Sequence, residues 1–138
     1  MQISISVSET AHWHALIGRA EFHVRQLLPY GIEDYLVRLF MRFEKNEKPG
    51  LPMVNEAGET NTAGAKLQNL GDQCLLLCGF YPEASDEYGV SLQEFVSMGR
   101  EAYEKLAKIE HDEKAIMFEY VADNVAQVTE MLCYIHST

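Results

Sequence analysis

The chain has 138 residues, of which 47% are hydrophobic, and its 21 acidic and 11 basic side chains give a formal net charge of -10. This length suits one domain, residues 1–138, with a core of its own, and the negative charge argues against nucleic acid or an anionic membrane surface as a partner. No apolar run approaches the ~20 residues that a membrane-spanning helix needs.

The first predicted helix covers residues 9–28. It opens at a capping-box pattern, Ser6 to Glu9, and stops at Pro29. In residues 1–8, apolar and polar side chains alternate as they do in a strand. Because an isolated strand is unstable, we expect an extended tail that lies on the body of the protein or is exchanged with a partner.

This first helix carries two apolar faces. The larger one is the expected core face, with Trp13, Leu16, Ile17, Ala20, Val24 and Leu27. The second one points elsewhere and consists of Ala11, Ala15, Gly18 and Phe22. Either a second subunit or a loop of the same chain could cover it. Two-fold dimers are the commonest soluble assemblies, so we expect a homodimer.

Four further helices follow, and most of them have recognisable breakers or caps. They are predicted at residues 32–45, 62–81, 91–109 and 112–135, with a long loop at 46–61. Pro82 ends the third helix, and Ser91 with Glu94 forms a capping-box pattern at the start of the fourth. The sequence therefore predicts an all-α, single-domain bundle of about five helices.

The helices at 62–81 and 91–109 are joined by a short turn, which predicts a central antiparallel hairpin. Gly64, Gly71 and Gly79 lie along one side of the first of these helices. Each glycine costs a helix about 1 kcal/mol, so three in one stripe indicate that the neighbouring backbone comes unusually close. Gly99 and Ala102 offer small residues on the other helix.

Counting residues outward from the turn places Asp72 and Arg100 at the same height in the hairpin, about 13 Å along each helix. We expect the carboxylate and the guanidinium to pair, directly or through one water. A buried pair of this kind loses several kcal/mol of stability when one partner is removed, whereas an exposed pair is worth under ~1 kcal/mol.

Several residues of the hairpin carry a resemblance to a known family. Leu70-Gly71-Asp72, then Gly79-Phe80-Tyr81-Pro82, then Met98-Gly99 with Ala102-Tyr103 resemble the signature of an uncharacterised bacterial protein family without an assigned activity. The resemblance covers about a quarter of the chain. It departs at Glu94-Phe95, where the family tends to have paired tyrosines. It implies the hairpin and adds no chemistry.

Metal and thiol chemistry are weakly indicated. Glu9 and His12 have the Glu-x-x-His spacing of di-metal bundles, but no second such motif occurs. We therefore expect no metal and no cofactor. The start of the chain lacks the features of a secretory signal, so we expect a cytoplasmic protein in which Cys74, Cys78 and Cys133 are reduced and buried.

One polar residue is oddly placed in the last predicted helix. Asn124 falls within its apolar arc, where a buried amide needs partners. It either bonds a neighbouring backbone or tyrosine hydroxyl, or faces a cavity and orients a ligand together with Tyr103 and Tyr120.

These observations favour a binding or accessory module that acts through a protein partner or a small ligand. The alternative is a small helical enzyme that uses an interior polar or metal-assisted site around Asp72, Arg100, Tyr103 and Asn124.

Overall fold

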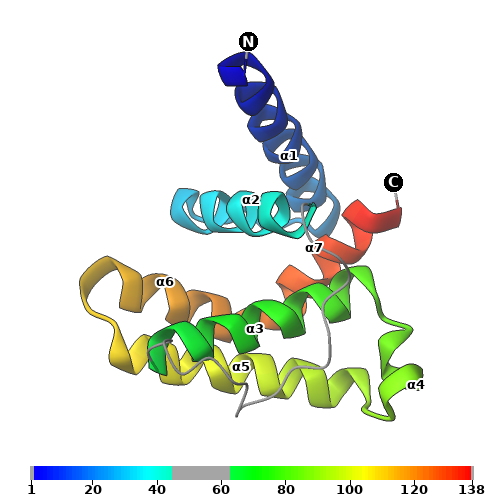
Figure 1. Ribbon diagram of the computed structural model, residues 1–138, viewed down its shortest axis with the longest axis vertical. Coiled ribbons are helices and arrows are strands. Elements are labelled where there is room, and N and C mark those ends of the chain that lie inside the picture. The colour runs from blue at the N-terminus through cyan, green and yellow to red at the C-terminus, as the bar shows by residue number, and fades with distance from the viewer. Residues whose placement is uncertain (1, 45–62, 138) are drawn as a thin grey trace.

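The computed structural model describes residues 2–44 and 63–137, and the predicted loop at 46–61 lies outside these ranges. Within them every regular element is a helix (Figure 1). The helices are α1 (Gln2–Val24), α2 (Tyr30–Glu44), α3 (Ala63–Phe80), α4 (Ala84–Tyr88), α5 (Leu92–Ile109), α6 (Asp112–Asp123) and α7 (Val125–Ser137). The predicted all-α bundle is confirmed, with more helices than the expected five.

Helix α1 differs from its prediction at both ends. It begins at Gln2, so the predicted extended tail at residues 1–8 is wrong, as is the capping box at Ser6. A helix bonds its own backbone groups, whereas a lone strand leaves them without partners. At the other end, Arg25 adopts a left-handed φ of 60°. Its N–H donates to the Phe22 carbonyl over 3.2 Å, and the Gln26 N–H donates to the Glu21 carbonyl over 3.0 Å, which is the Schellman pattern of a helix end.

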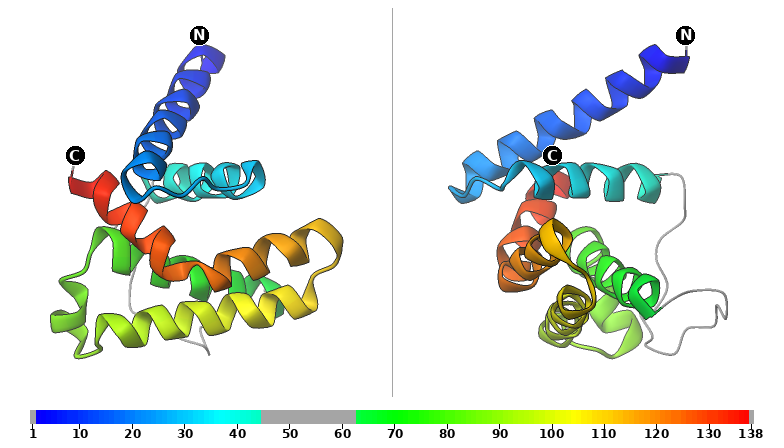
Figure 2. Two further views of the ribbon diagram at one scale, coloured as in Figure 1. Left: turned by 180° about the vertical axis from the view of Figure 1, so that it is seen from behind. Right: turned by 90° about the vertical axis from the view of Figure 1, so that its left-hand side faces the viewer.

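The α1–α2 pair stacks on a lower group of helices made of α3, α5, α6 and α7 (Figure 2). Helix α1 contacts α2 and α7, and the Trp13 and Phe40 rings lie 4.9 Å apart between their centroids. The N-terminal half of α1 extends away from this body (Figure 1). Leu27, expected in the core, is 83% exposed because α1 has ended before it.

Helices α3 and α5 run antiparallel and make the most extensive contact in the fold, as predicted. Their connection contains the short α4. The predicted cap of α5 is present: the Ser91 hydroxyl accepts from the Glu94 N–H over 3.1 Å, and the Glu94 carboxylate accepts from the Ser91 N–H over 2.9 Å. Helix α7 packs against α3, and α6 against α5.

The predicted helix at 112–135 is divided in two at Asn124. The Asn124 side-chain amide donates to the Tyr120 carbonyl over 2.9 Å, and such local bonds compete with the helical pattern. The break also changes which residues face inward. Phe118, Val121 and Ala122 are the buried residues of α6, whereas Ile116 is 67% exposed.

Candidate functional site

The close contact between α3 and α5 depends on two glycines. A Cβ atom on Gly71 would lie 2.7 Å from the Tyr103 ring, and one on Gly99 would lie 3.0 Å from Cys74 Cβ. Gly79 was predicted to serve the same contact but faces Leu132 of α7 instead. Gly71 therefore allows the buried Tyr103 ring to lie against the α3 backbone, next to Asp72.

Asp72 is the centre of a buried hydrogen-bonding cluster. Its side chain is 3% exposed. The Tyr103 hydroxyl donates to its Oδ1 atom over 2.5 Å, and the Tyr35 hydroxyl donates to the same oxygen. A carboxylate can be buried when such donors replace the water that it has lost. We call Asp72, Tyr35 and Tyr103 the Asp72 cluster.

The two hydroxyls of this cluster remain protonated donors. Burial and the negative charge of Asp72 raise the pKa of Tyr103 and of Tyr35 well above the ordinary value for tyrosine. Neither phenol is therefore suited to give up its proton near neutral pH. Their geometry suits fixing the carboxylate and holding the three helices α2, α3 and α5 together.

Asp72 and Arg100 form no direct ion pair in the part of the chain that the structure describes. Two ion pairs within single helices are present there, Asp34 with Arg38 and Glu101 with Lys105. Asp72 and Arg100 lie at similar heights in the hairpin, as predicted, since Asp72 bonds a side chain of α5 close to Arg100. However, Tyr103, three residues further along α5, is the residue that points into the contact.

Asn124 and Tyr120 belong to a separate polar group. The Gln26 side-chain amide donates to the Tyr120 hydroxyl and to the Asn124 Oδ1 atom, over 3.2 Å in each case. This group joins the end of α1 to the junction of α6 and α7. The predicted interior cluster is thus divided: Asp72 lies with Tyr103, Asn124 lies with Tyr120, and Arg100 bonds to neither group.

A cleft of about 640 Å³ opens beside the Asp72 cluster, between α2, α3 and α6. We call it the α2–α6 cleft. It is lined by Gly31, Asp34, Tyr35, Arg38, Met41, Gln68, Glu110, Lys114, Met117 and Phe118. Tyr35 is the link between the two features, because its ring meets Phe118 edge-on at 5.7 Å while its hydroxyl reaches Asp72.

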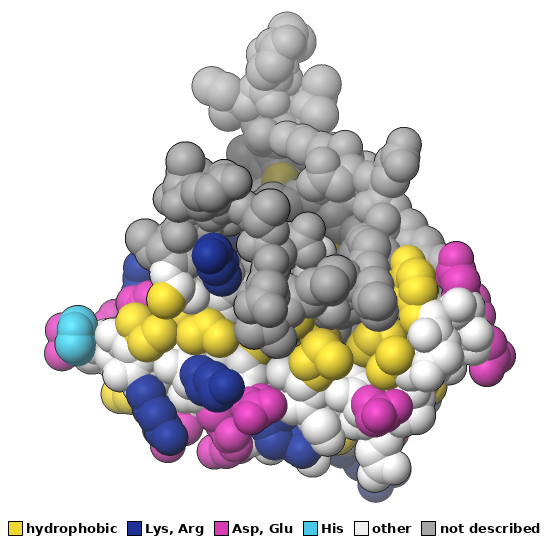
Figure 3. Space-filling model, turned by 60° about the horizontal axis from the view of Figure 1, so that its bottom comes forward, with side chains coloured by type: hydrophobic (Ala, Val, Ile, Leu, Met, Phe, Trp, Pro, Cys, Tyr) yellow, Lys and Arg dark blue, Asp and Glu magenta, His cyan; other side chains and the backbone are white. Residues whose placement is uncertain are grey.

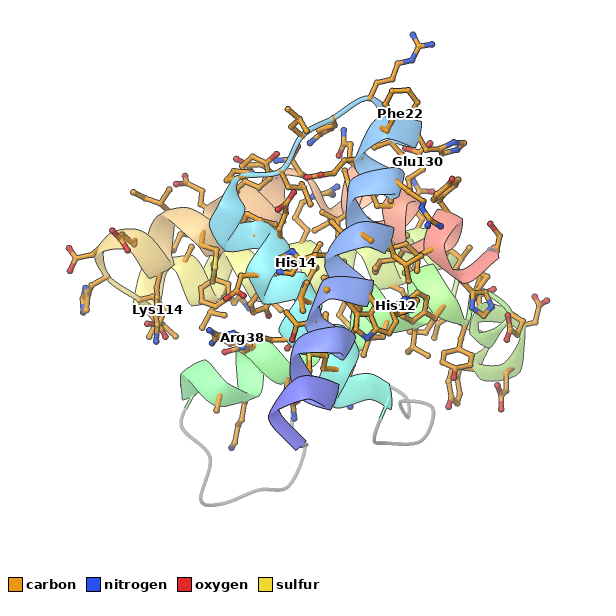
Figure 4. All side chains as sticks on the ribbon, turned by 90° about the horizontal axis from the view of Figure 1, so that it is seen from above. His12, His14, Phe22, Arg38, Lys114 and Glu130 are labelled. Atoms are coloured by element: carbon orange, nitrogen blue, oxygen red, sulfur yellow. The ribbon has the colours of Figure 1, made fainter. Side chains whose placement is uncertain are left out.

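The charged residues of the α2–α6 cleft differ in how they are partnered. Arg38 Nε lies 3.1 Å from the Asp34 carboxylate. Lys114 is exposed and forms no ion pair with any residue that the structure describes. Figure 4 shows Arg38 on α2 and Lys114 on α6 on the same side of the molecule. The cleft therefore combines an apolar wall with two cationic residues, Arg38 and Lys114, and two carboxylates, Asp34 and Glu110.

The cysteines are free thiols in environments that suppress their reactivity. Cys74 and Cys78 are buried, and burial raises the pKa of Cys74 to about 12 and that of Cys78 to about 11. Cys133 was expected to be buried but is exposed, and its pKa is raised as well. Reactive cysteines need the thiolate form, so these positions do not suggest a nucleophile.

Sequence reasoning did not include Tyr35 among the candidate site residues and did not connect it to Asp72. It also gave no role to Gln68. A tyrosine at a core spacing signals that a buried hydroxyl needs a partner, but the partner comes from a helix distant in sequence. Among the described residues, no group of three or more metal-ligating side chains occurs.

Comparisons with known proteins give this site no assigned counterpart: no family model matches the chain, and neither a curated protein nor a solved structure does. None of the helices in the described ranges is long and apolar enough to cross a membrane.

Proposed function

We propose that the protein is a binding module whose α2–α6 cleft takes a small organic ligand with an apolar body and an anionic end. The observation that carries the proposal is the position of Tyr35. Its ring lines the cleft and its hydroxyl is fixed by the buried Asp72 carboxylate. A binding wall that is ordered before the ligand arrives reduces the entropic cost of binding.

The lining supports this class of ligand. Met41, Met117 and Phe118 offer apolar and polarisable contacts, which adapt well to flat or aliphatic groups. Lys114 supplies a cation without an ion-pair partner among the described residues, and Arg38 supplies a second one beside Asp34. An anionic end on the ligand would be attracted to these two residues.

The enzyme alternative receives less support. The hydroxyls and thiols nearest the Asp72 cluster have raised pKa values and stay protonated near neutral pH. General acid-base work favours groups whose pKa lies near the working pH. These pKa values favour a cleft that binds a ligand over one that catalyses a reaction.

We further propose that the protein works in the cytoplasm as a homodimer and has no nucleic-acid partner. The charge of -10 supports the last point because it repels phosphate backbones. The exposed apolar side chains at the end of α1, Phe22 and Leu27, support the dimer.

Titration with 1-anilinonaphthalene-8-sulfonate, an apolar ring system with a sulfonate, tests the cleft. We expect saturable fluorescence enhancement that Met117→Trp abolishes by filling the cleft and that Lys114→Glu weakens. Ile109→Trp, a matched change at a partly exposed position outside the lining, should leave the titration unchanged. Equal titrations for all these proteins would refute the cleft as the binding site.

A further inference from the structure

The end of α1 presents an unusual combination of apolar and basic side chains. Phe22 is 86% exposed and Leu27 is 83% exposed, and Arg19 and Arg25 are exposed beside them. We call these four residues the basic surface. Glu21 is the only acidic residue between Thr10 and Pro29, and it is 4% exposed. In a chain with a net charge of -10, these four residues include two arginines and no acidic side chain, and the exposed Glu130 of α7 is labelled near Phe22 in Figure 4.

The basic surface is also hollowed. Its four residues line a cleft of about 750 Å³ together with Glu21, His23, Gln26 and Tyr134. The His23 and Tyr134 rings stack at 4.3 Å between centroids and form one wall. Phe22 is labelled in Figure 4 at the end of α1, on the outside of the molecule. The cleft can therefore accept an apolar side chain from outside.

Helix α6 carries the opposite combination. Ile116 is 67% exposed, and Glu113, Glu119 and Asp123 are exposed one or two turns away from it on the same side of the helix. We call these four residues the acidic surface. The α2–α6 cleft uses the other side of α6, where Lys114 and Phe118 lie.

The C-terminal end of α6 lies close to the end of α1. Gln26, at the end of α1, bonds both Tyr120 and Asn124 at the end of α6. The left view of Figure 2 shows the end of α1 and the whole of α6 on the side that faces the viewer. The two helix segments that carry these charges therefore lie on one side of the molecule.

The charges of these surfaces are not neutralised within the described chain. Arg19 and Arg25 form no ion pair with any described residue, and neither do Glu113, Glu119 or Asp123. The face seen in Figure 3 mixes acidic and basic side chains, and on α5 Glu101 pairs with Lys105 at 3.8 Å. Segregated charge of both signs on one side is what a self-complementary interface needs.

We infer that a second copy of this chain covers both surfaces, with the basic surface of each protomer on the acidic surface of the other. A two-fold axis generates this contact twice, since residue i meets residue j and residue j meets residue i. Ile116 of each copy enters the cleft of the other copy beside Phe22. The inference rests on the proposed homodimer and assigns its interface.

This arrangement replaces the small-residue face of α1 as the dimer contact. That face includes Ala15 and Gly18, and both are exposed. Its exposed flank carries Arg19, so pairing this face with itself would bring like charges together. An anionic vesicle or an acidic peptide is an alternative occupant of the basic surface. Either would cover the basic surface alone and would leave the apolar Ile116 side chain exposed to water.

Charge reversal tests the interface. One variant carries Arg19→Glu with Arg25→Glu, and the other carries Glu113→Lys with Glu119→Lys. We expect a dimer for the unchanged protein in sedimentation velocity. Each variant alone should dissociate, with the dissociation constant raised more than about tenfold. An equimolar mixture of the two variants should form a heterodimer again, because both contacts then join opposite charges.

The control is Glu101→Lys with Glu104→Lys on α5, which makes the same charge change at exposed positions outside both surfaces and should leave the dimer intact. Far-ultraviolet circular dichroism checks that each variant is folded, and Arg19→Gln with Arg25→Gln offers a milder test. A dimer that persists in both charge-reversed variants, or a mixture that stays monomeric, overturns this interface. A monomeric unchanged protein overturns the proposed homodimer itself, whereas vesicle binding without a dimer would assign the basic surface to lipid and also refute the inference.

Discussion

The Tyr103 hydroxyl donates to the buried Asp72 carboxylate over 2.5 Å, and this bond joins α5 to α3 where Gly71 lets the two helices touch. Because Tyr35 donates to the same carboxylate oxygen from α2, three helices meet at one charged group. The stability of the hairpin and the position of the cleft wall thus depend on the same atoms.

Removing one of these donors should destabilise the protein. We expect Tyr103→Phe to lower the free energy of unfolding by about 1–3 kcal/mol, since a buried acceptor loses a partner. Urea denaturation measures the change. Tyr88→Phe, at a half-buried position outside the Asp72 cluster, should stay within about 0.5 kcal/mol of the unchanged protein. Equal effects of the two substitutions would show that the Asp72 bond contributes nothing specific.

Two glycine-to-alanine substitutions should change the stability of the protein in opposite directions. Gly71→Ala places a methyl group 2.7 Å from the ring of Tyr103, which is fully buried and cannot move aside. We expect a net loss of about 1–3 kcal/mol from overpacking. Gly18→Ala adds its methyl where no atom lies within 4 Å, so it should stabilise α1 by about 0.5–1 kcal/mol. Thermal melting of both variants tests the contrast, and a stabilising Gly71→Ala would contradict the close contact.

Local signals in the sequence predicted the parts of the fold that local interactions determine. The cap at Ser91 could be predicted from the sequence because its partner Glu94 lies three residues away. The close approach at Gly71 was readable because a glycine inside a helix needs a reason. The height of Asp72 followed from counting along a hairpin with a short connection.

Contacts between distant elements could not be read in the same way. Tyr35 reaches Asp72 only because the fold brings α2 next to α3, and no local pattern in the sequence predicts that neighbourhood. Arg100 and Tyr103 differ by less than one turn, and chain counting cannot tell which of them faces inward. The break at Asn124 depends on a side-chain bond that competes with a helical pattern, and the apolar periodicity on both sides hides it.

The stability of the junction between α1 and α2 should depend on pH through Glu21. Its pKa is raised from 4.5 to about 7, first by burial and then by hydrogen bonding to Glu33, against the opposing effect of the Leu28 N–H. A raised pKa favours the protonated form in the folded state. The stabilising contribution is therefore complete below about pH 4.5 and is lost as the pH rises through about 7.

We expect Glu21→Gln to remove this dependence, because the amide stays neutral while it can still accept from Leu28. The free energy of unfolding, measured from about pH 4.5 to about pH 8, should fall by about 1–3 kcal/mol more in the unchanged protein than in the variant. Glu104→Gln, an exposed carboxyl on α5, is the control. Parallel pH profiles for Glu21→Gln and the unchanged protein would refute the assignment to Glu21.

Thiol accessibility should separate Cys133 from the two cysteines of α3. With a chromogenic disulfide reagent, we expect Cys133 to react in the folded protein, slowly because its pKa is raised, since its side chain is exposed on α7. Cys74 and Cys78 should react only after unfolding, because both are buried. Burial raises the pKa of Cys74 to about 12 and that of Cys78 to about 11. Cys133→Ser should abolish the reaction of the folded protein, whereas Cys74 and Cys78 of this variant should still react after unfolding. Rapid labelling of Cys74 in the native state would mean that the α3–α5 contact opens readily, which the close approach of Gly99 to Cys74 argues against.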